Sequence, residues 1–196
     1  LDEFYSVFAN RFSVNFNPET DLVKIGVVNQ TTLLASETQE IANYLKNSMS
    51  EKYGLKNLSE HFADTRDTLC YATNDNQQAT LGLLEQDADF AVVVGGYNSS
   101  NTSHIVELCE KKIPTYFIST EKEIESANLI HHYNFEQQKH ITTKGFLPDK
   151  YPVNIIVTSG ASCPDSQVEK IIDRLLGFFP GVKNKKAVLK EFELSL

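Results

Sequence analysis

The sequence contains few cysteines, no long apolar run and no excess of basic residues. Three cysteines among 196 residues are an odd and sparse set, which argues against a disulfide framework and favours a reducing compartment. The longest apolar runs, such as Phe90–Val94, are far shorter than the roughly 18 residues that span a bilayer, so no membrane span is expected. Lys and Arg number 18 against 26 Asp and Glu, a formal net charge of -8, so we expect no nucleic-acid-binding surface.

Targeting signals, repeats and biased segments are also lacking. The first residues, Leu-Asp-Glu-Phe, include no Met, no basic cluster and no small-residue cleavage pattern, so no signal peptide is visible in this sequence. No internal repeat or low-complexity tract occurs, and hydrophobic residues at 41% with charged residues at 22% are typical of globular proteins. A length of 196 residues fits one domain, or one domain with part of another.

Apolar periodicity predicts alternating strands and helices. Short apolar runs predict strands at residues 22–28, 90–94, 114–119 and 153–157, with a short extended piece at 61–67. Helical spacing and capping residues predict an opening helix over residues 1–12 and further helices at 36–54, 75–86, 102–111 and 164–179. This alternation predicts an α/β fold with parallel strands and right-handed crossovers, in which the first strand lies in a separate sheet from the other three. Residues 134–150 are expected to form a polar connection, and residues 182–196 a mixed-charge tail.

Three loops that follow predicted strands are rich in hydroxyl and amide side chains. They are residues 29–32, 98–103 and 158–162. In open α/β sheets, ligands bind beyond the carboxyl ends of the strands, and helix N-termini attract anions through their free N–H groups. None of the three loops contains Lys or Arg, yet together they outline a cradle of neutral donors for phosphate, which the backbone of Gly160 can approach closely. The alternative is that these side chains only cap helices.

Isolated cysteines and histidines give weaker signals. Cys70 directly precedes a predicted helix, where a thiol tends toward the thiolate, so it is a candidate nucleophile or metal ligand, or else a small buried hydrophobe. Cys109 lies at core spacing within a predicted helix and is expected to pack, whereas Cys163 has no partner at metal-ligand spacing. His131 and His132 lie in an expected strand, so their side chains point to opposite faces and cannot share a metal ion.

Four short motifs occur in order along the chain. They read Asn-Gln-Thr-Thr-Leu at residues 29–33, Asp-Thr-Leu-Cys-Tyr-Ala-Thr at 67–73, Gly-Gly-Tyr-Asn-Ser-Ser-Asn-Thr-Ser-His at 95–104 and Thr-Ser-Gly-Ala-Ser-Cys-Pro-Asp at 158–165. Together they resemble the 4-hydroxy-3-methylbut-2-enyl diphosphate reductases, the IspH or LytB family, in its longer bacterial and plastid branch, and the resemblance covers residues 1–179. It implies the last step of the non-mevalonate isoprenoid pathway. In that step a 4Fe-4S cluster reductively removes a hydroxyl from an allylic diphosphate, which yields isopentenyl and dimethylallyl diphosphate.

The resemblance also implies roles for individual residues. Cys70 matches one of three cysteine ligands of the cluster, which leaves the fourth iron open to the substrate oxygen. Thr31 matches a catalytic threonine near the substrate hydroxyl and its proton relay, and Thr32 matches a substrate-binding threonine beside it. The matched diphosphate ligands are Ser99, Ser100, Asn101 and Ser162. The implied electron donor is of the ferredoxin or flavodoxin type, and the implied location is the bacterial cytoplasm or, in a eukaryote, the plastid.

The chain also departs from the family pattern. Family members carry two further cluster cysteines, diphosphate-binding histidines and a proton-supplying glutamate in a segment that would precede Leu1, and Cys109 and Cys163 match no ligand position. The resemblance thus implies part of a three-domain, trefoil-like reductase: residues 1–65 from the middle α/β domain, residues 66–181 as the third domain with one unpaired sheet edge, and residues 182–196 as a tail. These 196 residues alone are expected not to reduce the substrate. The alternatives are a non-catalytic phosphate-binding module that lost its cluster domain, and a sugar- or nucleotide-phosphate enzyme on a flavodoxin-like sheet.

Overall fold

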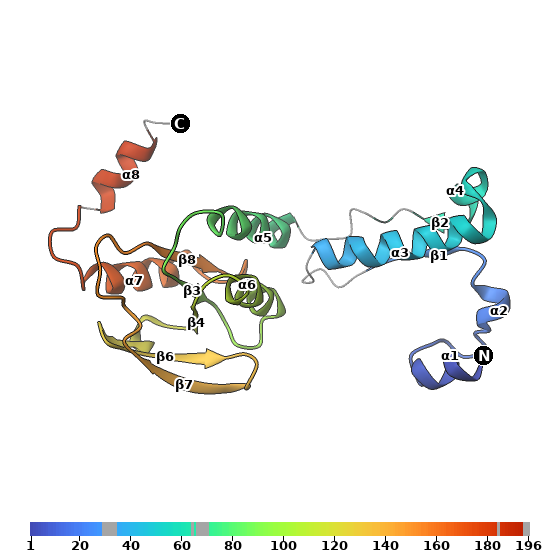
Figure 1. Ribbon diagram of the computed structural model, residues 1–196, viewed down its shortest axis with the longest axis horizontal. Coiled ribbons are helices and arrows are strands. Elements are labelled where there is room, and N and C mark those ends of the chain that lie inside the picture. The colour runs from blue at the N-terminus through green and yellow to red at the C-terminus, as the bar shows by residue number, and fades with distance from the viewer. Residues whose placement is uncertain (29–34, 64, 66–70, 184, 194–196) are drawn as a thin grey trace. The chain divides into compact units, whose positions relative to one another are not determined.

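The computed structural model describes residues 1–28, 35–63, 65, 71–183 and 185–193 (Figure 1). The chain divides into two compact units, Leu1–Cys70 and Tyr71–Leu196. Within the described ranges, none of the helices combines the length and the apolar character that a membrane crossing requires.

The N-terminal unit is mostly helical. Its elements are α1 (Asp2–Val7), α2 (Pro18–Asp21), β1 (Ile25–Gly26), α3 (Ala35–Tyr53), the 3-10 helix η1 (Leu55–Asn57), α4 (Leu58–His61) and β2 (Phe62–Ala63). β1 and β2 pair in parallel, and a 2.7 Å hydrogen bond joins the His61 imidazole to the Val23 carbonyl. The His61 ring also stacks on Tyr53 with centroids 3.7 Å apart, so α4 is fixed both to the turn before β1 and to the end of α3.

Two predictions for this unit are wrong in length. The strand expected at residues 22–28 is reduced to Ile25 and Gly26, because its partner β2 is itself only two residues long. The opening helix expected over residues 1–12 ends at Val7, and Asn10 and Asn15 then adopt positive φ angles that a helix does not allow. The helix predicted at 36–54 is confirmed as α3, within one residue at each end.

The C-terminal unit contains a six-stranded mixed sheet. Its elements are α5 (Tyr71–Leu83), β3 (Phe90–Val94), α6 (Ser100–Glu110), β4 (Thr115–Ile118), the 3-10 helix η2 (Glu121–Glu123), β5 (Ile124–Ser126), β6 (Leu129–Asn134), β7 (Lys139–Lys144), β8 (Ile155–Ser159), α7 (Asp165–Leu176) and α8 (Lys185–Glu193). The strand order is β5-β6-β4-β3-β8, with β7 also paired to β6. β3 runs parallel to both β4 and β8. The parallel sheet predicted from the three later apolar runs, separate from the first strand, is therefore confirmed.

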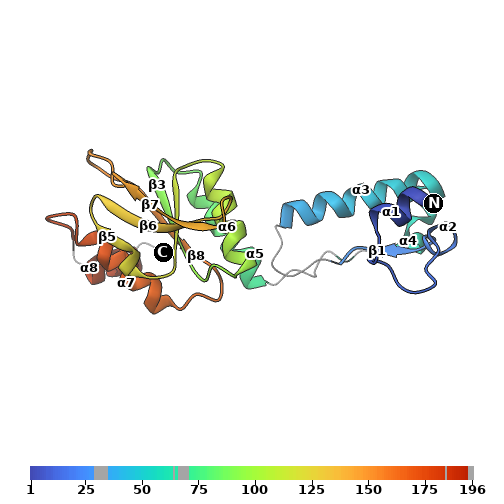
Figure 2. The ribbon, with the colours of Figure 1, turned by 90° about the horizontal axis from the view of Figure 1, so that it is seen from below.

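The central strand β3 separates two hydrophobic cores. Its five residues are all buried, and successive side chains point to opposite faces of the sheet. On one face, Ala91 and Val93 pack with residues of α6 such as Ile105. On the other face, the alternate β3 side chains pack with Ile171 and Leu175 of α7. Helices therefore cover both sides of the sheet, as expected of an α/β fold (Figure 2).

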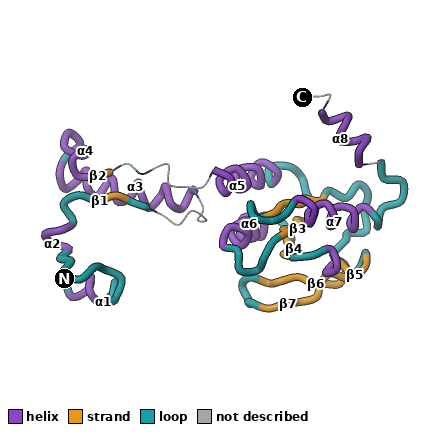
Figure 3. Tube along the Cα trace, turned by 180° about the vertical axis from the view of Figure 1, so that it is seen from behind, coloured by secondary structure: helices purple, strands orange, loops and turns teal. Residues whose placement is uncertain are grey.

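The expectation of unbroken βα alternation is wrong after β4. β6 runs antiparallel to β4, β5 and β7, and β6 and β7 lie side by side as a hairpin (Figure 3). The polar connection predicted at residues 134–150 contains β7, a strand with an exposed edge and little apolar patterning apart from Ile141. The predicted tail includes α8, and Lys185 at its start forms ion pairs with Glu169 and Asp173 of α7 at 2.9 and 2.7 Å.

Three helix and strand boundaries also differ from prediction. α5 begins at Tyr71, four residues before the expected cap at Asp75. α6 begins at Ser100 rather than Thr102, because Ser99 serves as its N-cap. β8 spans Ile155–Ser159, two residues later than the predicted 153–157. The hydrogen bonds of its cap decide where a helix begins, and pairing with its neighbour decides where a strand begins and ends. Apolar periodicity alone therefore predicts these boundaries only approximately.

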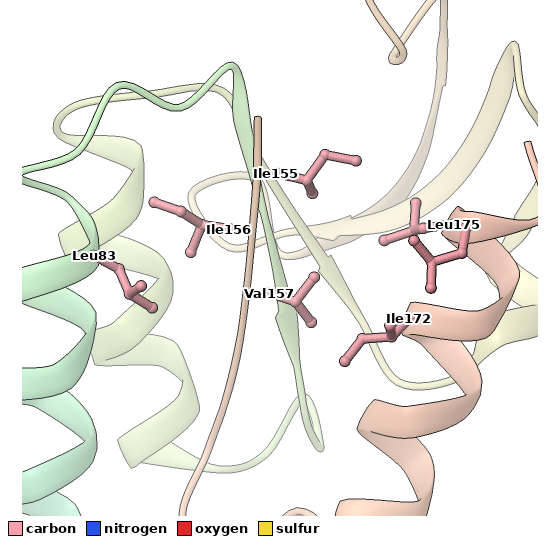
Figure 4. A pocket seen from close by; sticks show the side chains of 7 residues that line it. Leu83, Ile155, Ile156, Val157, Ile172 and Leu175 are labelled. Carbon is pink, nitrogen blue, oxygen red and sulfur yellow. The ribbon is translucent and has the colours of Figure 1, made fainter. Parts of the chain in front are cut away.

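One edge of the large sheet is open among the described residues. β8 pairs with β3 alone, so its other edge has no strand beside it in the described part of the chain. A cavity of about 380 Å³ runs along this strand between α5 and α7, and apolar side chains line it (Figure 4). The lining residues are Leu83, Ile155, Ile156, Val157, Ile172, Leu175 and Leu176. The family resemblance implies an unpaired sheet edge here, and β8 has such an edge in the described part of the chain.

Candidate functional site

Two of the three hydroxyl-rich loops meet at the carboxyl edge of the large sheet. Val94 at the end of β3 is paired with Ser159 at the end of β8, so the loops that follow these strands start side by side. The Gly160 N–H donates to the Val94 carbonyl at 3.1 Å, which joins the two loops at their first residues. The loops after β3 and β8 therefore lie together, as predicted, whereas the third loop, residues 29–32, lies outside the described residues.

Thr102 anchors the first turn of α6 between two glycines. Its side chain is fully buried, and a Cβ added to Gly95 or Gly160 would lie 2.6 or 2.1 Å from its hydroxyl oxygen. Such separations are too short for any real side chain, so only glycine fits at either position. The sequence predicts a close backbone approach at Gly160, and the group that approaches it in the structure is the Thr102 hydroxyl.

Ser99 caps α6 through its hydroxyl oxygen. That oxygen accepts the Thr102 N–H at 3.3 Å and the Thr102 hydroxyl at 3.0 Å, while the Ser99 carbonyl accepts the Ser103 hydroxyl at 3.1 Å. The capping alternative is therefore confirmed for Ser99. A hydroxyl that accepts two hydrogen bonds still has its own proton to donate, so capping leaves Ser99 able to bind an acceptor on a ligand.

Asn101 carries a buried amide without a hydrogen-bond partner in the described part of the chain. Its residue surface is 5% exposed, and neither Nδ2 nor Oδ1 has a hydrogen bond there. A buried polar group left unpaired costs about 1–3 kcal/mol, so native proteins retain few of them. The amide of Asn101 thus lies unpaired in the first turn of α6, beside a hydroxyl-rich loop.

Ser100, the first residue of α6, and Ser162, in the loop after β8, are both exposed. Ser100 also lines a cavity of about 260 Å³ on the outer side of α6, next to Tyr97, His104 and Phe135. The Ser162 loop is closed by a hydrogen bond from the Cys163 N–H to the Gly160 carbonyl at 2.9 Å. The predicted site residues Thr31, Thr32 and Cys70 lie outside the described residues. The single pocket expected to join Thr31, Ser99, Ser100, Asn101 and Ser162, with Cys70 at its inner end, therefore stays a prediction.

The helix that follows Cys70 lies along the same end of the sheet. Asn76 Nδ2 of α5 donates to the Ser159 carbonyl at 3.2 Å, and the Thr80 hydroxyl is bonded to the Thr158 hydroxyl at 2.9 Å. α5 is thus hydrogen-bonded to Thr158 and Ser159, the last two residues of β8. Sequence reasoning missed Asn76 and Thr80. The available signal was a polar stripe at helical spacing, whose members Thr73, Gln77 and Thr80 are buried.

The two described cysteines do not form a metal site. Cys109 packs in the core on the α6 face of the sheet, and burial raises the pKa of its thiol to about 12. Cys163 packs against the core on the opposite, α7 face, where burial also raises the pKa of its thiol. Across the described ranges, no group of three or more His, Cys, Asp or Glu residues could hold a metal ion. The described residues therefore do not fit a complete iron–sulfur site.

The two adjacent histidines behave as their strand position predicts. His131 is partly exposed and bonds to Glu125 and Thr142 at 2.7 and 2.8 Å, whereas His132 is buried on the other face and bonds to Thr143 at 2.8 Å. Their opposite directions confirm that they cannot share a metal ion. Burial lowers the pKa of His132, which keeps this imidazole neutral in the core.

Comparison with known proteins identifies the family. The family model described as LytB protein matches residues 4–176. This chain belongs to the LytB family. The reductase of Crocosphaera subtropica, named 4-hydroxy-3-methylbut-2-enyl diphosphate reductase, is 45% identical over 176 residues, which is 89% of this chain and 43% of that protein. The protein of the same name from Thermosynechococcus vestitus is 41% identical over 173 residues, 88% of this chain and 42% of that protein.

The family predicted from the four sequence motifs is thus confirmed. A solved structure titled as (E)-4-hydroxy-3-methyl-but-2-enyl diphosphate reductase, the terminal enzyme of the non-mevalonate pathway, aligns with a TM-score of 0.44 and 20% identity. That alignment covers 84% of this chain and 49% of the solved chain. The LytB chain described here spans less than half the length of the curated relatives that it matches.

The close packing of Thr102 against Gly95 and Gly160 can be tested by mutation. Gly160→Ala is expected to lower the free energy of unfolding by about 1–3 kcal/mol, because the new methyl group overlaps the buried Thr102 side chain. Gly96→Ala is the matched control: no atom lies within 4 Å of its added Cβ, so a change within about 0.5 kcal/mol is expected. Urea denaturation followed by circular dichroism measures both. Equal stability of the two variants would contradict the packing described for Thr102.

Proposed function

We propose that this chain is part of a 4-hydroxy-3-methylbut-2-enyl diphosphate reductase, and that the N-terminal end of α6 binds the diphosphate of the substrate. Family membership and the names of the relatives support the activity. The observation that carries the binding site is the buried, unpartnered amide of Asn101. A diphosphate presents acceptor oxygens, which are the partners that the two N–H bonds of this amide lack.

The donors at this edge can bind an anion although the two loops that form it contain no Lys or Arg. The first N–H groups of α6 have no partner inside the helix, and the helix dipole favours negative charge there. The hydroxyls of Ser99 and Ser100 at the start of α6, and that of Ser162 in the loop after β8, add neutral donors. Backbone and hydroxyl donors of this kind recur at phosphate sites on α/β sheets, so we propose that the three serines and Asn101 together hold the diphosphate.

The remaining site roles rest on the family resemblance. We propose Cys70 as one thiolate ligand of a 4Fe-4S cluster, Thr31 as a catalytic residue near the substrate hydroxyl, and Thr32 as a substrate-binding residue. The Asp-Thr-Leu-Cys-Tyr-Ala-Thr motif at residues 67–73, which resembles the family's cysteine motif, supports the role of Cys70. When bound, the cluster supplies the electrons for reductive removal of the hydroxyl, a change that consumes two electrons and two protons and releases water.

The proposed reductase needs partners that the sequence does not specify. We propose an electron donor of the ferredoxin or flavodoxin type, and a location in the bacterial cytoplasm or in a plastid. We also propose residues 1–65 as part of the middle domain, 66–181 as the third domain and 182–196 as a tail. The open edge of β8 supports this division, since an apolar groove beside an unpaired strand is where a further strand of a larger reductase would add.

The diphosphate site is tested by removing the orphan amide. Asn101→Ala is expected to weaken binding of inorganic diphosphate by about 1–2 kcal/mol, roughly 5- to 30-fold, because the anion loses a charge-assisted donor. The free energy of unfolding without ligand should not fall, because the variant also removes a buried unpaired group. Ser162→Ala should weaken binding by a similar amount. Isothermal titration calorimetry and urea denaturation of the full chain measure the two quantities.

Asn128→Ala is the matched control, since Asn128 is an exposed asparagine in the turn between β5 and β6. Its affinity for diphosphate should equal that of the unaltered chain. Equal affinities for Asn101→Ala and the unaltered chain, or loss of folded stability in Asn101→Ala without loss of binding, would contradict the proposed site.

A further inference from the structure

The carboxylate of Glu123 accepts hydrogen bonds from the loop after β3 and from the loop after β4. Glu123 is the last residue of η2, the 3-10 helix after β4. Its Oε1 accepts a hydrogen bond from the Tyr97 hydroxyl. Its Oε2 accepts the Ser119 N–H at 2.7 Å, the Ser119 hydroxyl at 3.1 Å and the Thr120 N–H at 3.0 Å. Four donors therefore converge on one partly buried side chain.

The first branch from this carboxylate leads to the α6 loop. Tyr97 lies two residues before Ser99, and the Ser99 N–H closes a turn onto the Gly96 carbonyl at 3.0 Å. The Tyr97 ring packs against Phe117 and stacks on Tyr133, each with centroids 5.0 Å apart. Burial, reinforced by Glu123, raises the pKa of Tyr97 well above its usual range, so this phenol keeps its proton and remains the donor. The loop is thus held at a point next to the α6 cap.

The second branch leads to the Ser162 loop. The Ser119 carbonyl accepts a hydrogen bond from Gln167 Nε2 at 2.9 Å. Gln167 lies in the first turn of α7, where its own N–H donates to the Pro164 carbonyl at 2.9 Å. The Ser162 loop enters α7 through Pro164, so Ser119, fixed by two hydrogen bonds to Glu123, also positions the end of that loop.

We propose that Glu123 is a positioning residue for the diphosphate site, acting through Tyr97 on the α6 loop and through Ser119 on the Ser162 loop. The inference rests on the proposed function, because it assigns Glu123 to the site that Asn101 and the serines form. A purely local role, capping the turn after β4, needs only the N–H groups of Ser119 and Thr120. The hydrogen bond to Tyr97, 26 residues away in the chain, serves no such cap.

The two roles are separated by Tyr97→Phe, which removes one hydroxyl and leaves the turn-capping bonds of Glu123 intact. Positioning predicts that the dissociation constant of inorganic diphosphate for the full chain rises about three- to tenfold, the range of a single hydrogen bond. In the enzyme expressed from the whole coding sequence, KM for the allylic diphosphate should rise by a similar factor while kcat changes less than twofold. Binding that weakens without a change in the chemical step is the signature of a misplaced binding loop.

A double-mutant cycle tests whether Glu123 is the partner through which Tyr97 acts. Glu123→Gln should weaken diphosphate binding at least as much as Tyr97→Phe, and adding Tyr97→Phe to Glu123→Gln should change affinity less than twofold. Tyr133→Phe is the control: it removes a hydroxyl from the ring stacked on Tyr97 and leaves the Tyr97–Glu123 bond in place. Gln167→Met tests the second branch in the same assay and should also weaken binding.

The outcomes distinguish this inference from the proposed function. Failure of the unaltered chain to bind inorganic diphosphate would contradict the proposed function itself. Binding by the unaltered chain together with affinities within twofold for both Tyr97→Phe and Gln167→Met would overturn the positioning role and leave Glu123 as a turn cap. Should Tyr97→Phe lose its folded circular dichroism spectrum, Gln167→Met decides the question alone: weakened binding supports the role and unchanged binding overturns it.

Discussion

Cys70→Ser in the enzyme expressed from the whole coding sequence is expected to abolish the visible absorption of the iron–sulfur cluster and, with it, all reductase activity. Thiolates hold such clusters, and a serine hydroxyl is a much poorer ligand at neutral pH. We expect iron content to fall together with absorbance after anaerobic reconstitution. The three readouts should change together, because each depends on the same proposed ligand.

Cys163→Ser is the matched control for this experiment. Cys163 packs against the α7-side core, and its thiol pKa is raised by burial, so it is not poised to bind metal. Its serine variant should keep the cluster spectrum and the activity. A variant set in which Cys163→Ser loses the spectrum while Cys70→Ser retains it would reverse the assignment.

A protein of these 196 residues alone is expected to form no stoichiometric cluster and no product. One matched cysteine cannot replace the three thiolates that a 4Fe-4S cluster with one open iron uses. Cys109 and Cys163 cannot supply the rest without large rearrangement, because they pack in cores on opposite faces of the sheet. The measurement is anaerobic reconstitution followed by an assay with a chemical reductant and the allylic diphosphate.

The protein expressed from the whole coding sequence serves as the positive control under identical conditions. It should yield isopentenyl and dimethylallyl diphosphate, whereas the 196-residue chain should yield neither. Product formation by the shorter chain at a comparable rate would show that Cys109 or Cys163 acts as a ligand, and that the proposed division of the site is wrong.

The parts of the fold that the sequence predicts well are those with one strong local pattern. Phe90–Val94 is a continuous apolar run, and it forms the fully buried central strand because both of its faces are covered. By contrast, β7 has polar residues on both faces, so no alternation marks it as a strand. Residues 22–28 are apolar enough to predict a strand, but strand length depends on the partner, and β2 offers only two residues.

In the candidate site too, features set by the local sequence could be predicted, whereas features set by tertiary packing could not. A hydroxyl cap within residues 98–103 and a close approach at Gly160 follow from residue type and position alone, although the cap is Ser99 and the helix starts earlier than predicted. The burial of the Asn101 amide does not, because it depends on how α6 packs on the sheet. The hydrogen bond between Tyr97 and Glu123 also could not be predicted from the sequence, because it requires η2 to lie beside the loop that precedes α6.

The most direct test of the proposed site is a titration of inorganic diphosphate into the ¹⁵N-labelled chain, followed by nuclear magnetic resonance of the backbone amides. If α6 and the Ser162 loop bind the diphosphate, the amide signals of Ser99, Ser100, Asn101 and Ser162 should shift in a saturable way, with one dissociation constant. Signals on the β6–β7 hairpin should stay unchanged. Saturable shifts confined to another surface, or no saturable shift at all, would contradict the assignment of this sheet edge as the diphosphate site.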